Sequence, residues 1–249
     1  MRILVTNDDG HLAGGLHTLA AAARELADVH VIAPDREQSA TSHSLTLHYP
    51  LRARRTGDNV QVVDGTPTDC VVLAVGELLS DRPDFVLSGV NHGANLGDDV
   101  LYSGTVAAAM EATILGIPAV AVSYTGPDAN EMGGWHDVLV KLLRQLLLRD
   151  DFPAETLLNV NLPGVPPEEL VGIKVTTLGR RAYVNSLTRA QDPNGREYFW
   201  IGGGESKWWG SPESDFHAVH AGYISVTPLH LDLTNYRLLE NIGRWNLTL

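Results

Sequence analysis

Three short polar clusters in the sequence each follow an apolar run that is typical of a buried strand. They are residues 7–10 (NDDG), 34–39 (PDREQS) and 88–91 (SGVN). In an open α/β sheet, binding sites form beyond the carboxyl ends of the strands, so we expect these clusters to converge on one edge. The adjacent acids Asp8 and Asp9 repel each other unless a cation lies between them. Carboxylate, hydroxyl and amide oxygens suit Mg²⁺, Mn²⁺ or Ca²⁺, so this edge is a candidate divalent-cation site.

A candidate anion site lies where a loop rich in Gly and Asn, within residues 88–111, leads into a helix of small residues. Ser103, Gly104 and Thr105 open that helix. Backbone N–H groups and the helix dipole favour an anion there, and a glycine lets it approach the backbone closely. A simpler interpretation, in which Ser103 or Thr105 only caps the helix, is compatible with phosphate binding. For Asp8 and Asp9 the simpler interpretation is a turn with a helix cap.

Strand and helix patterns alternate through the first half of the chain and would position both sites. Strands are predicted at residues 2–6, 29–33, 85–88, 119–123 and 157–162. Helices are predicted at residues 16–26, 67–79, 105–115 and 135–149. This alternation predicts an α/β fold, with a Rossmann-like, mostly parallel sheet flanked by helices.

After about residue 163 the helical periodicity fades, and Gly, Pro and aromatic residues increase. The predicted elements there are strands at 171–177 and 198–201 with a turn at 192–195 between them, an irregular stretch over 202–210, a strand at 223–227 and a helix at 236–246. Residues 45–52 are also β-rich and predict a projecting hairpin at about 44–63. We therefore predict a core of residues 1–163 and a β-rich oligomerisation extension with a terminal helix, residues 164–249.

Composition and charge exclude several classes of protein. The 249 residues are 44% hydrophobic, which is enough for a substantial core. Acidic residues number 30 and basic residues 18, and the net charge of −12 argues against a nucleic-acid polymer as partner. No apolar run approaches the roughly 18 residues of a membrane helix, and the N-terminus does not have a signal-peptide pattern. With the single cysteine Cys70, which suits a reducing compartment, these features predict a cytoplasmic protein without a membrane partner.

A series of motifs in a fixed order carries a family resemblance. They are residues 7–10 (NDDG), 33–36 (APDR), 39–47 (SATSHSLTL), 65–70 (GTPTDC), 88–91 (SGVN), 95–97 (NLG), 102–109 (YSGTVAAA) and 222–229 (GYISVTPL). Together they resemble the SurE family, the stationary-phase survival proteins. Gly14 and Ala112 depart from the Pro and Gly that are usual in that family.

The resemblance implies a metal-dependent phosphatase that hydrolyses nucleoside 5′- and 3′-monophosphates, and it suggests activity on polyphosphate as well. In the family, one divalent cation, Mg²⁺ or Mn²⁺, is held by residues that match Asp8, Asp9, Ser39 and Asn91. The substrate phosphate is expected near Asn91, Ser103, Gly104 and Thr105. Asp8 and Asp9 are the catalytic candidates, and the sequence leaves open which of them orients the attacking water.

The resemblance also implies a Rossmann-like N-terminal domain and a β-rich C-terminal part that often swaps between subunits. Strands separated by long Gly-rich stretches have a weak core of their own and need a partner surface. We therefore expect a homodimer or a homotetramer. Aromatic residues of this part, which such interfaces favour, are Tyr198, Phe199, Trp200, Trp208 and Trp209.

Two other classes of protein have sites that partly match these residues. A receiver-like signalling module without hydrolytic activity also binds Mg²⁺ beside paired acids, but it requires a phospho-accepting Asp where residues 88–91 read SGVN. A dinucleotide-binding oxidoreductase requires G-x-G-x-x-G after the first strand, and the sequence lacks it there. Assaying phosphate release from AMP with Mg²⁺ or Mn²⁺ discriminates the three classes.

Some other residues invite a functional interpretation. His92 could transfer protons, and His217 with His220 could bind zinc from one helix face. The resemblance does not support the first, and the histidine pair lacks a third ligand at an obvious spacing. We expect Cys70 to be a buried structural thiol. Tryptophans in the second half could stack on a base, but we expect interface or core roles for them.

Overall fold

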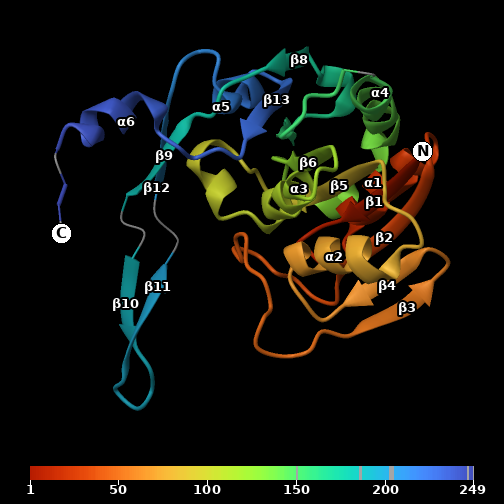
Figure 1. Ribbon diagram of the computed structural model, residues 1–249, viewed down its shortest axis with the longest axis horizontal. Coiled ribbons are helices and arrows are strands. Elements are labelled where there is room, and N and C mark those ends of the chain that lie inside the picture. Colours follow the sequence, from red (N-terminus) through yellow and green to blue (C-terminus); the bar gives the residue numbers. More distant parts are fainter. Residues whose placement is uncertain (150, 185–186, 202–204, 246, 249) are drawn as a thin grey trace.

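A nine-stranded sheet forms the centre of the molecule (Figure 1). The computed structural model describes residues 1–149, 151–184, 187–201, 205–245 and 247–248. The strand order is β3-β4-β2-β1-β5-β6-β7-β13-β8. The bounds are β1 (Arg2–Thr6), β2 (Asp28–Pro34), β3 (Ala53–Gly57), β4 (Val60–Val63), β5 (Phe85–His92), β6 (Ala119–Tyr124), β7 (Thr156–Leu162), β8 (Gly172–Val175) and β13 (Tyr223–His230).

Six neighbouring strands of the sheet run parallel to one another, as the alternating pattern predicts. In sheet order they are β4, β2, β1, β5, β6 and β7. From β1 the chain proceeds to β2 on one side, whereas β5, β6 and β7 follow on the other side. The order of strands therefore reverses between β1 and β5, and the crevice beyond their carboxyl ends is the place where such sheets bind ligands. Thr6, the last residue of β1, pairs with Ser88 of β5 at this point.

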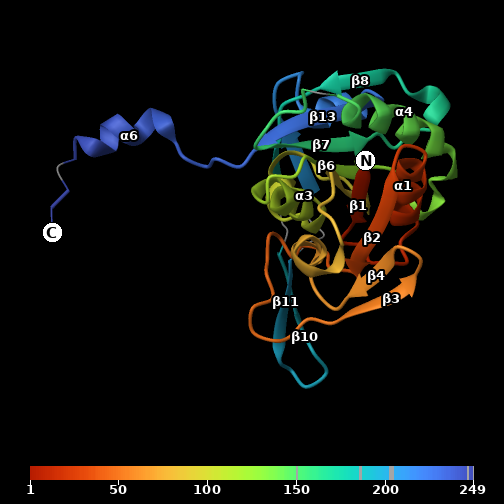
Figure 2. The ribbon, with the colours of Figure 1, turned by 45° about the vertical axis from the view of Figure 1, so that its right-hand side comes forward.

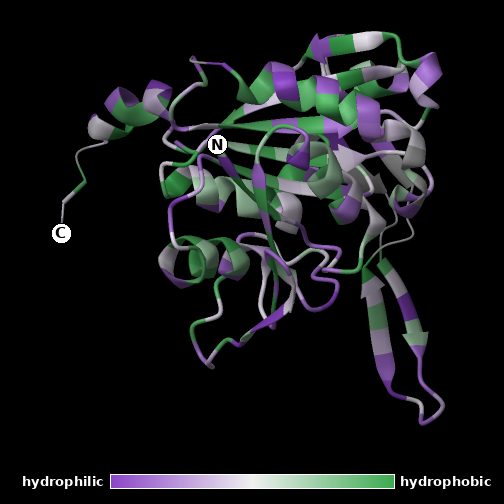
Figure 3. Cartoon of the chain, turned by 90° about the vertical axis from the view of Figure 1, so that its right-hand side faces the viewer, coloured by the Kyte–Doolittle hydropathy of each residue, from purple (hydrophilic) through white to green (hydrophobic). Residues whose placement is uncertain are grey.

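Two layers of helices cover the sheet (Figure 2). On one face, α1 (Gly14–Arg24) packs against α4 (His136–Leu147), and their apolar residues join one core cluster. On the other face, α2 (Pro67–Leu73) packs against α3 (Gly104–Ile114), and they join a second cluster. Figure 3 shows hydrophobic residues along the strands between these layers. None of the helices in the described part of the chain is long and apolar enough to cross a membrane.

The second half of the chain contributes both to this sheet and to structures that leave it. β13 is antiparallel to β7, and β8 is parallel to β13, so the sheet continues past the boundary predicted at residue 163. Two small antiparallel pairs form the two ends of one long hairpin that projects from the body (Figure 1). They are β9 (Arg180–Val184) with β12 (Glu205–Trp209), and β10 (Leu187–Gln191) with β11 (Glu197–Ile201).

Two further helices belong to the second half, α5 (Asp215–His220) and α6 (Tyr236–Gly243). α5 packs against β13, whereas α6 lies apart from the body in both Figure 1 and Figure 2, with no buried residue. The remaining helical segments are short: η1 (Ala74–Leu78), η2 (Gly97–Leu101), η3 (Ala129–Glu131), η4 (Gly133–Trp135) and η5 (Pro167–Glu169).

The mostly parallel α/β fold that the sequence predicts is confirmed, and β5 continues four residues beyond its predicted end. The helix predicted at 67–79 is α-helical only to Leu73 and continues as the π-helical turn η1. Residue 246, the predicted end of the last helix, and residues 202–204, predicted as irregular, lie outside the described residues.

The hairpin predicted at about 44–63 exists but is shorter than predicted and does not project. Residues 45–52 form no strand, because the backbone N–H groups of Thr46 and Arg52 donate to the carboxylates of Asp69 (2.9 Å) and Asp64 (2.6 Å) rather than to a neighbouring strand. Only β3 and β4 pair, and they extend the edge of the central sheet instead of projecting.

The irregular stretch predicted around the Trp208-Trp209 pair is also wrong. Both tryptophans lie in β12, and Trp209 pairs with Arg180 of β9. The strand Leu187–Gln191 was not predicted, and the turn at 192–195 connects it to β11 rather than connecting β8 to β11. Glycine clusters next to these segments resemble loop signals, but cross-strand pairing between distant residues determines the structure.

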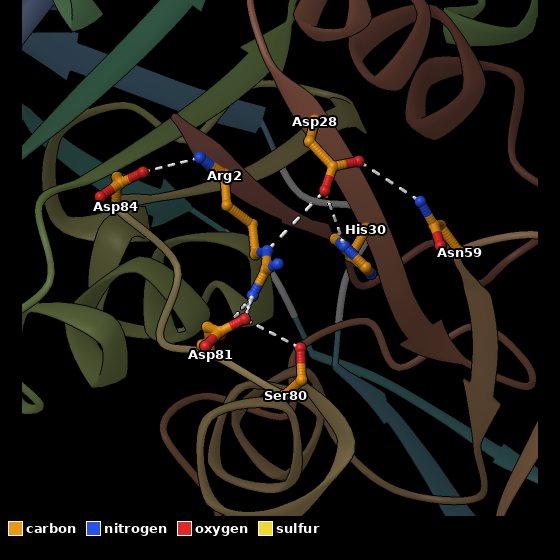
Figure 4. A network of polar contacts seen from close by, with 7 residues as sticks. All are labelled: Arg2, Asp28, His30, Asn59, Ser80, Asp81 and Asp84. Carbon is orange, nitrogen blue, oxygen red and sulfur yellow. Dashed lines mark hydrogen bonds and ion pairs between the residues drawn. The ribbon is translucent and has the colours of Figure 1, made fainter.

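A network of hydrogen bonds and ion pairs lies at the amino ends of β1 and β2 (Figure 4). The Arg2 guanidinium contacts Asp81 at 2.7 Å and Asp28 at 3.7 Å, and its backbone N–H donates to Asp84 at 2.6 Å. The hydrogen bond from Arg2 lowers the pKa of Asp81 below its ordinary value. The network connects β1 and β2 to the segment before β5 at the edge opposite the carboxyl ends.

Candidate active site

A cavity of about 660 Å³ opens beside the carboxyl ends of β1 and β5, where the strand order reverses. Its lining combines four residues that the sequence nominates, Asp8, Ser39, Asn91 and Ser103, with residues from three other segments. The full lining is Asp8, Ser39, Ala40, Asn91, His92, Ala94, Asn95, Asp99, Tyr102, Ser103, Arg181 and Ile201. The predicted convergence of the polar clusters at one edge of the sheet is therefore observed.

Asp8 is the most buried acid of the site, with 5% of its surface exposed. Burial raises its pKa to about 6, and the nearby charge of Asp9 adds to the rise. The hydroxyl of Thr105 donates to Asp8 Oδ1, which holds the carboxylate in place and favours its charged form. A buried carboxylate with a raised pKa beside a second acid is an arrangement that a bound cation would stabilise.

Asp9 is fixed by the backbone of the strand next to it. The His92 N–H donates to Asp9 Oδ2 at 2.8 Å, across the junction between β1 and β5. Burial raises the pKa of Asp9 above its ordinary value, and the bond from His92 opposes that rise. The imidazole of His92 is engaged elsewhere, because its Nδ1 accepts the Ala129 N–H at 3.1 Å. His92 thus positions Asp9 through its backbone and is one of the residues that line the cavity.

Asn91 reaches the site because β5 is irregular near its end. The pairing of β5 with β6 shifts between Ser88 and Asn91, and Gly89 lies at that shift with φ +131°. A Cβ atom at Gly89 would approach the Val122 carbonyl oxygen to 2.1 Å, so a glycine is required there. The Asn91 Nδ2 donates to the Gly93 carbonyl at 2.8 Å, which fixes the side-chain amide with its oxygen as the remaining acceptor.

Ser39 lies on the loop that follows β2 and is exposed. Its hydroxyl donates to Glu37 Oε1 at 2.6 Å, while its oxygen retains acceptor capacity. The loop is fastened at its far end by His43, whose Nε2 lies 2.8 Å from Glu111 Oε2 on α3. Sequence analysis did not predict this pair, because the two residues are 68 positions apart, although His43 belongs to the motif at 39–47.

The start of α3 adjoins Asp8. Ser103 is the N-cap, and its Oγ accepts the Val106 N–H at 3.1 Å, so the capping interpretation of this residue is correct. Gly104 is the first helical residue, and a Cβ there would lie 2.9 Å from Asp8 Cβ and 3.1 Å from Thr41 Oγ1. The sequence explains Gly104 by the approach of an anion, whereas the structure adds a packing requirement against Asp8.

The donor set of the site fits a hard divalent cation. Asp8, Asp9, Ser39 and Asn91 offer carboxylate, hydroxyl and amide oxygens, the ligands that Mg²⁺ and Mn²⁺ prefer. Among the residues that the structure describes, no three His, Cys, Asp or Glu side chains converge, so a cation here would depend on neutral oxygens in addition to two carboxylates. Mg²⁺ usually keeps several water ligands, so a cation held by these residues would also bring water to the site.

A buried amide network positions the loop between β5 and α3, and sequence reasoning did not assign it. The Asn95 N–H donates to Asn161 Oδ1 at 2.9 Å, and its carbonyl accepts from Asn159 Nδ2 at 2.8 Å and Asn161 Nδ2 at 3.0 Å. The Asn95 side chain donates to Ser123 Oγ at 2.7 Å. The signal available was the repeated polar residue in the apolar strand 157–162, since a buried polar side chain requires a partner.

The other residues considered have packing roles. His217 and His220 contact Ser214 Oγ (2.8 Å) and the Phe216 carbonyl (2.9 Å) and lie outside the cavity lining. Cys70 is buried, and desolvation raises the pKa of its thiol well above the ordinary value, as expected for a structural cysteine. Trp208 stacks on Phe216 with ring centroids 4.7 Å apart.

The fold and the site together define a doubly wound α/β protein with an acidic, all-oxygen site beside a helix N-terminus at the reversal of strand order. The family Survival protein SurE matches residues 3–185. The 5′-nucleotidase SurE of Gemmatimonas aurantiaca is 59% identical over 98% of both chains, and that of Geotalea uraniireducens is 52% identical over 100% of both. The crystal structure of the SurE protein from Aquifex aeolicus superposes with a TM-score of 0.87 at 42% identity, covering 98% of this chain and 99% of that one. The chain belongs to the SurE family, which confirms the resemblance seen in the sequence motifs.

Proposed function

We propose that this protein is a divalent-metal-dependent phosphatase that hydrolyses nucleoside monophosphates, at the 5′ and also at the 3′ position. The observation that carries the proposal is the burial of Asp8 beside Asp9 and the first turn of α3, on a cavity that is large enough for a nucleotide. Relatives that are 59% and 52% identical bear the name 5′-nucleotidase, which supports the same activity here.

The residues of the site divide between cation and phosphate. Asp8 and Asp9 would hold the cation together with Ser39 and Asn91. The backbone N–H groups of the first turn of α3 would bind phosphate oxygens without a charged side chain. A bound Mg²⁺ or Mn²⁺ lowers the pKa of a water molecule and neutralises phosphoryl charge. The Thr105 hydroxyl keeps Asp8 in place while the cation and substrate bind.

The activity is tested by phosphate release from AMP. Purified protein with Mg²⁺ or Mn²⁺ should release inorganic phosphate, and excess EDTA should abolish the release until the cation is restored. Unchanged activity in EDTA would refute the metal dependence. Cation binding without any turnover would favour a receiver-like signalling module instead. 3′-AMP and a polyphosphate of defined length, assayed in parallel, test the 3′-nucleotidase and exopolyphosphatase activities.

The assignment of the acids is tested by comparing two substitutions. Asp8→Asn should reduce kcat by roughly 10²–10⁴-fold, the range for loss of a group that acts in the transition state. His92→Ala should have a small effect, because its backbone N–H still bonds to Asp9. Equal losses for the two variants would instead make the His92 ring a catalytic group.

We also propose that the protein is a homodimer or homotetramer and that the long hairpin and α6 of the second half form the contacts. Large apolar side chains on these elements are exposed, and Trp200 of β11 is 66% exposed. Exposed apolar surface of this kind marks an interaction site. A cytoplasmic location is proposed on the single buried thiol, which suits a reducing compartment.

A further inference from the structure

One wall of the cavity comes from the second half of the chain. Arg181 of β9 and Ile201 of β11 line it together with Asp99 and Tyr102 from the loop before α3. None of these residues belongs to the predicted cation or phosphate set. Both strand pairs of the projecting hairpin, through β9 and β11, therefore contribute to the wall of the cavity.

Arg181 is held in place from several sides. Its Nη1 pairs with Asp99 Oδ2, and its backbone N–H donates to Asp98 Oδ2 at 3.1 Å. The guanidinium carbon lies 4.8 Å from the ring centroid of Trp208, which itself stacks on Phe216. The side chains of Arg181 and Asp99 are 23% and 13% exposed, so the pair is largely removed from water. A guanidinium braced in this way loses little conformational entropy when it binds a ligand.

Asp215 fixes the hairpin root against the loop before α3. It is fully buried, and its carboxylate accepts the Gly97 N–H at 2.7 Å and the Gly179 N–H at 2.8 Å. Gly97 opens η2, which carries Asp99, and Gly179 directly precedes β9, which carries Arg181. One carboxylate thereby sets the position of both members of the pair.

The charges around Arg181 decide which part of a nucleotide fits there. The Asp99 carboxylate cancels the charge of Arg181, and Asp98 adds a second acid beside it. A phosphate dianion would be repelled by these carboxylates. Sugar hydroxyls and the polar edge of a base, in contrast, need both an acceptor and a donor, and a carboxylate beside a guanidinium supplies both.

We propose that the Asp99–Arg181 pair binds the nucleoside part of the substrate, an inference that rests on the proposed function. Asp99 accepts hydrogen bonds from sugar hydroxyls, and Arg181 donates to the base. The pair would thus select nucleotides over other phosphate monoesters, while the acids and the first turn of α3 act on the phosphate group.

The test compares a nucleotide with a small phosphate ester in variants of the full-length protein. Arg181→Met and Asp99→Asn are assayed on AMP and on p-nitrophenyl phosphate with saturating Mn²⁺, and adenosine is tested as a competitive inhibitor. Arg180→Met is the matched control, because Arg180 is exposed, is adjacent on the same strand and lies outside the cavity lining. Arg181→Lys, which keeps the charge but loses the fork of donors, is the milder variant.

For Arg181→Met and Asp99→Asn, KM for AMP and the inhibition constant of adenosine should rise about tenfold or more, as for a lost hydrogen bond to a charged group. The values of kcat/KM on p-nitrophenyl phosphate should stay within about twofold of wild type, which also shows that the variants are folded. Equal losses on both substrates, or unchanged values for AMP and adenosine, would overturn the proposal. Failure of the proposed function itself is distinguishable, because the wild-type protein would then release no phosphate from AMP, whatever its activity on p-nitrophenyl phosphate.

Discussion

At the scale of single residues, the proposed chemistry depends on a buried carboxylate, Asp8, whose negative charge is costly without a cation. Burial raises the pKa of Asp8 to about 6, well above the 3.8 of a free side chain. Each pKa unit corresponds to about 1.4 kcal/mol, so ionising Asp8 costs the cation-free protein roughly 3 kcal/mol. Divalent cations and the Thr105 hydroxyl both favour the charged form.

This pKa shift predicts how the stability of the chelated protein depends on pH. Because the folded state binds the proton more tightly, the contribution of Asp8 is fully present below about pH 4 and is lost as the pH rises through about 6. In EDTA, the melting temperature of Asp8→Asn should therefore exceed that of wild type at pH 7 but not at pH 4. Calorimetric scans of both proteins at the two pH values check this, and an equal difference at both would contradict it.

Gly104 carries a second prediction at this scale. A Cβ atom there would lie 2.9 Å from Asp8 Cβ, so Gly104→Val should force Asp8 to move. Turnover of AMP should be abolished and cation affinity should fall as well, because Asp8 is a proposed ligand. The matched control is Gly76→Ala, where an added Cβ meets nothing within 4 Å. Wild-type turnover by Gly104→Val would show that the first turn of α3 is only a cap.

At the scale of elements, the site depends on loops that are fastened to the sheet by side chains rather than by strand pairing. The loop before α3 is held by Asn95 against β7, and the loop after β2 is held by His43 against α3. These bonds join segments that are distant in the sequence. The carboxyl edge of the sheet is consequently a preorganised surface, and its shape depends on a few buried amides.

Removing one of these side-chain amides should lower the free energy of unfolding. Asn161→Leu leaves the buried N–H of Asn95 without its acceptor, which costs about 1–3 kcal/mol of unfolding free energy. Asn159→Leu should cost less, because Asn161 still donates to the same carbonyl. Urea denaturation with AMP kinetics on both variants checks the order. A larger effect of Asn159→Leu would contradict this account of the network.

At the scale of the whole molecule, the second half serves two purposes. Its strands β8 and β13 complete the central sheet, whereas its hairpin and α6 extend away from the body (Figure 2). The large apolar residues exposed on these two elements include Phe199, Trp200, Ile201, Leu239 and Ile242. Their exposure is the basis of the proposal that another chain covers them.

Light scattering at micromolar concentration should therefore give at least twice the mass of one chain. The paired substitutions Leu239→Asp and Ile242→Asp on α6 should shift the protein towards a smaller assembly, since charges are poorly tolerated in a buried apolar contact. Substitution of Glu240, which is also on α6, by Gln serves as the control. A monomeric wild type would refute the proposed assembly.

The sequence alone determined the class of fold and the residues nominated for the site. Alternating strand and helix periodicity predicts the parallel sheet, because burial of each element on the sheet imposes its own spacing of apolar residues. Asp8, Ser39 and Asn91 could be nominated because each belongs to a polar cluster after a predicted strand, and Ser103 because it opens a helix. Local pattern was therefore sufficient to place them at the carboxyl edge.

Only the tertiary structure decided which distant groups support that edge. The contact of Asp8 with Thr105, the clamp of Asn95 by β7 and the entry of Arg181 into the cavity all join residues more than 60 positions apart. The hairpin strands in the second half were misplaced for the same reason. Cross-strand pairing and side-chain hydrogen bonds depend on which segments meet in space, and the periodicity of one segment does not contain that information.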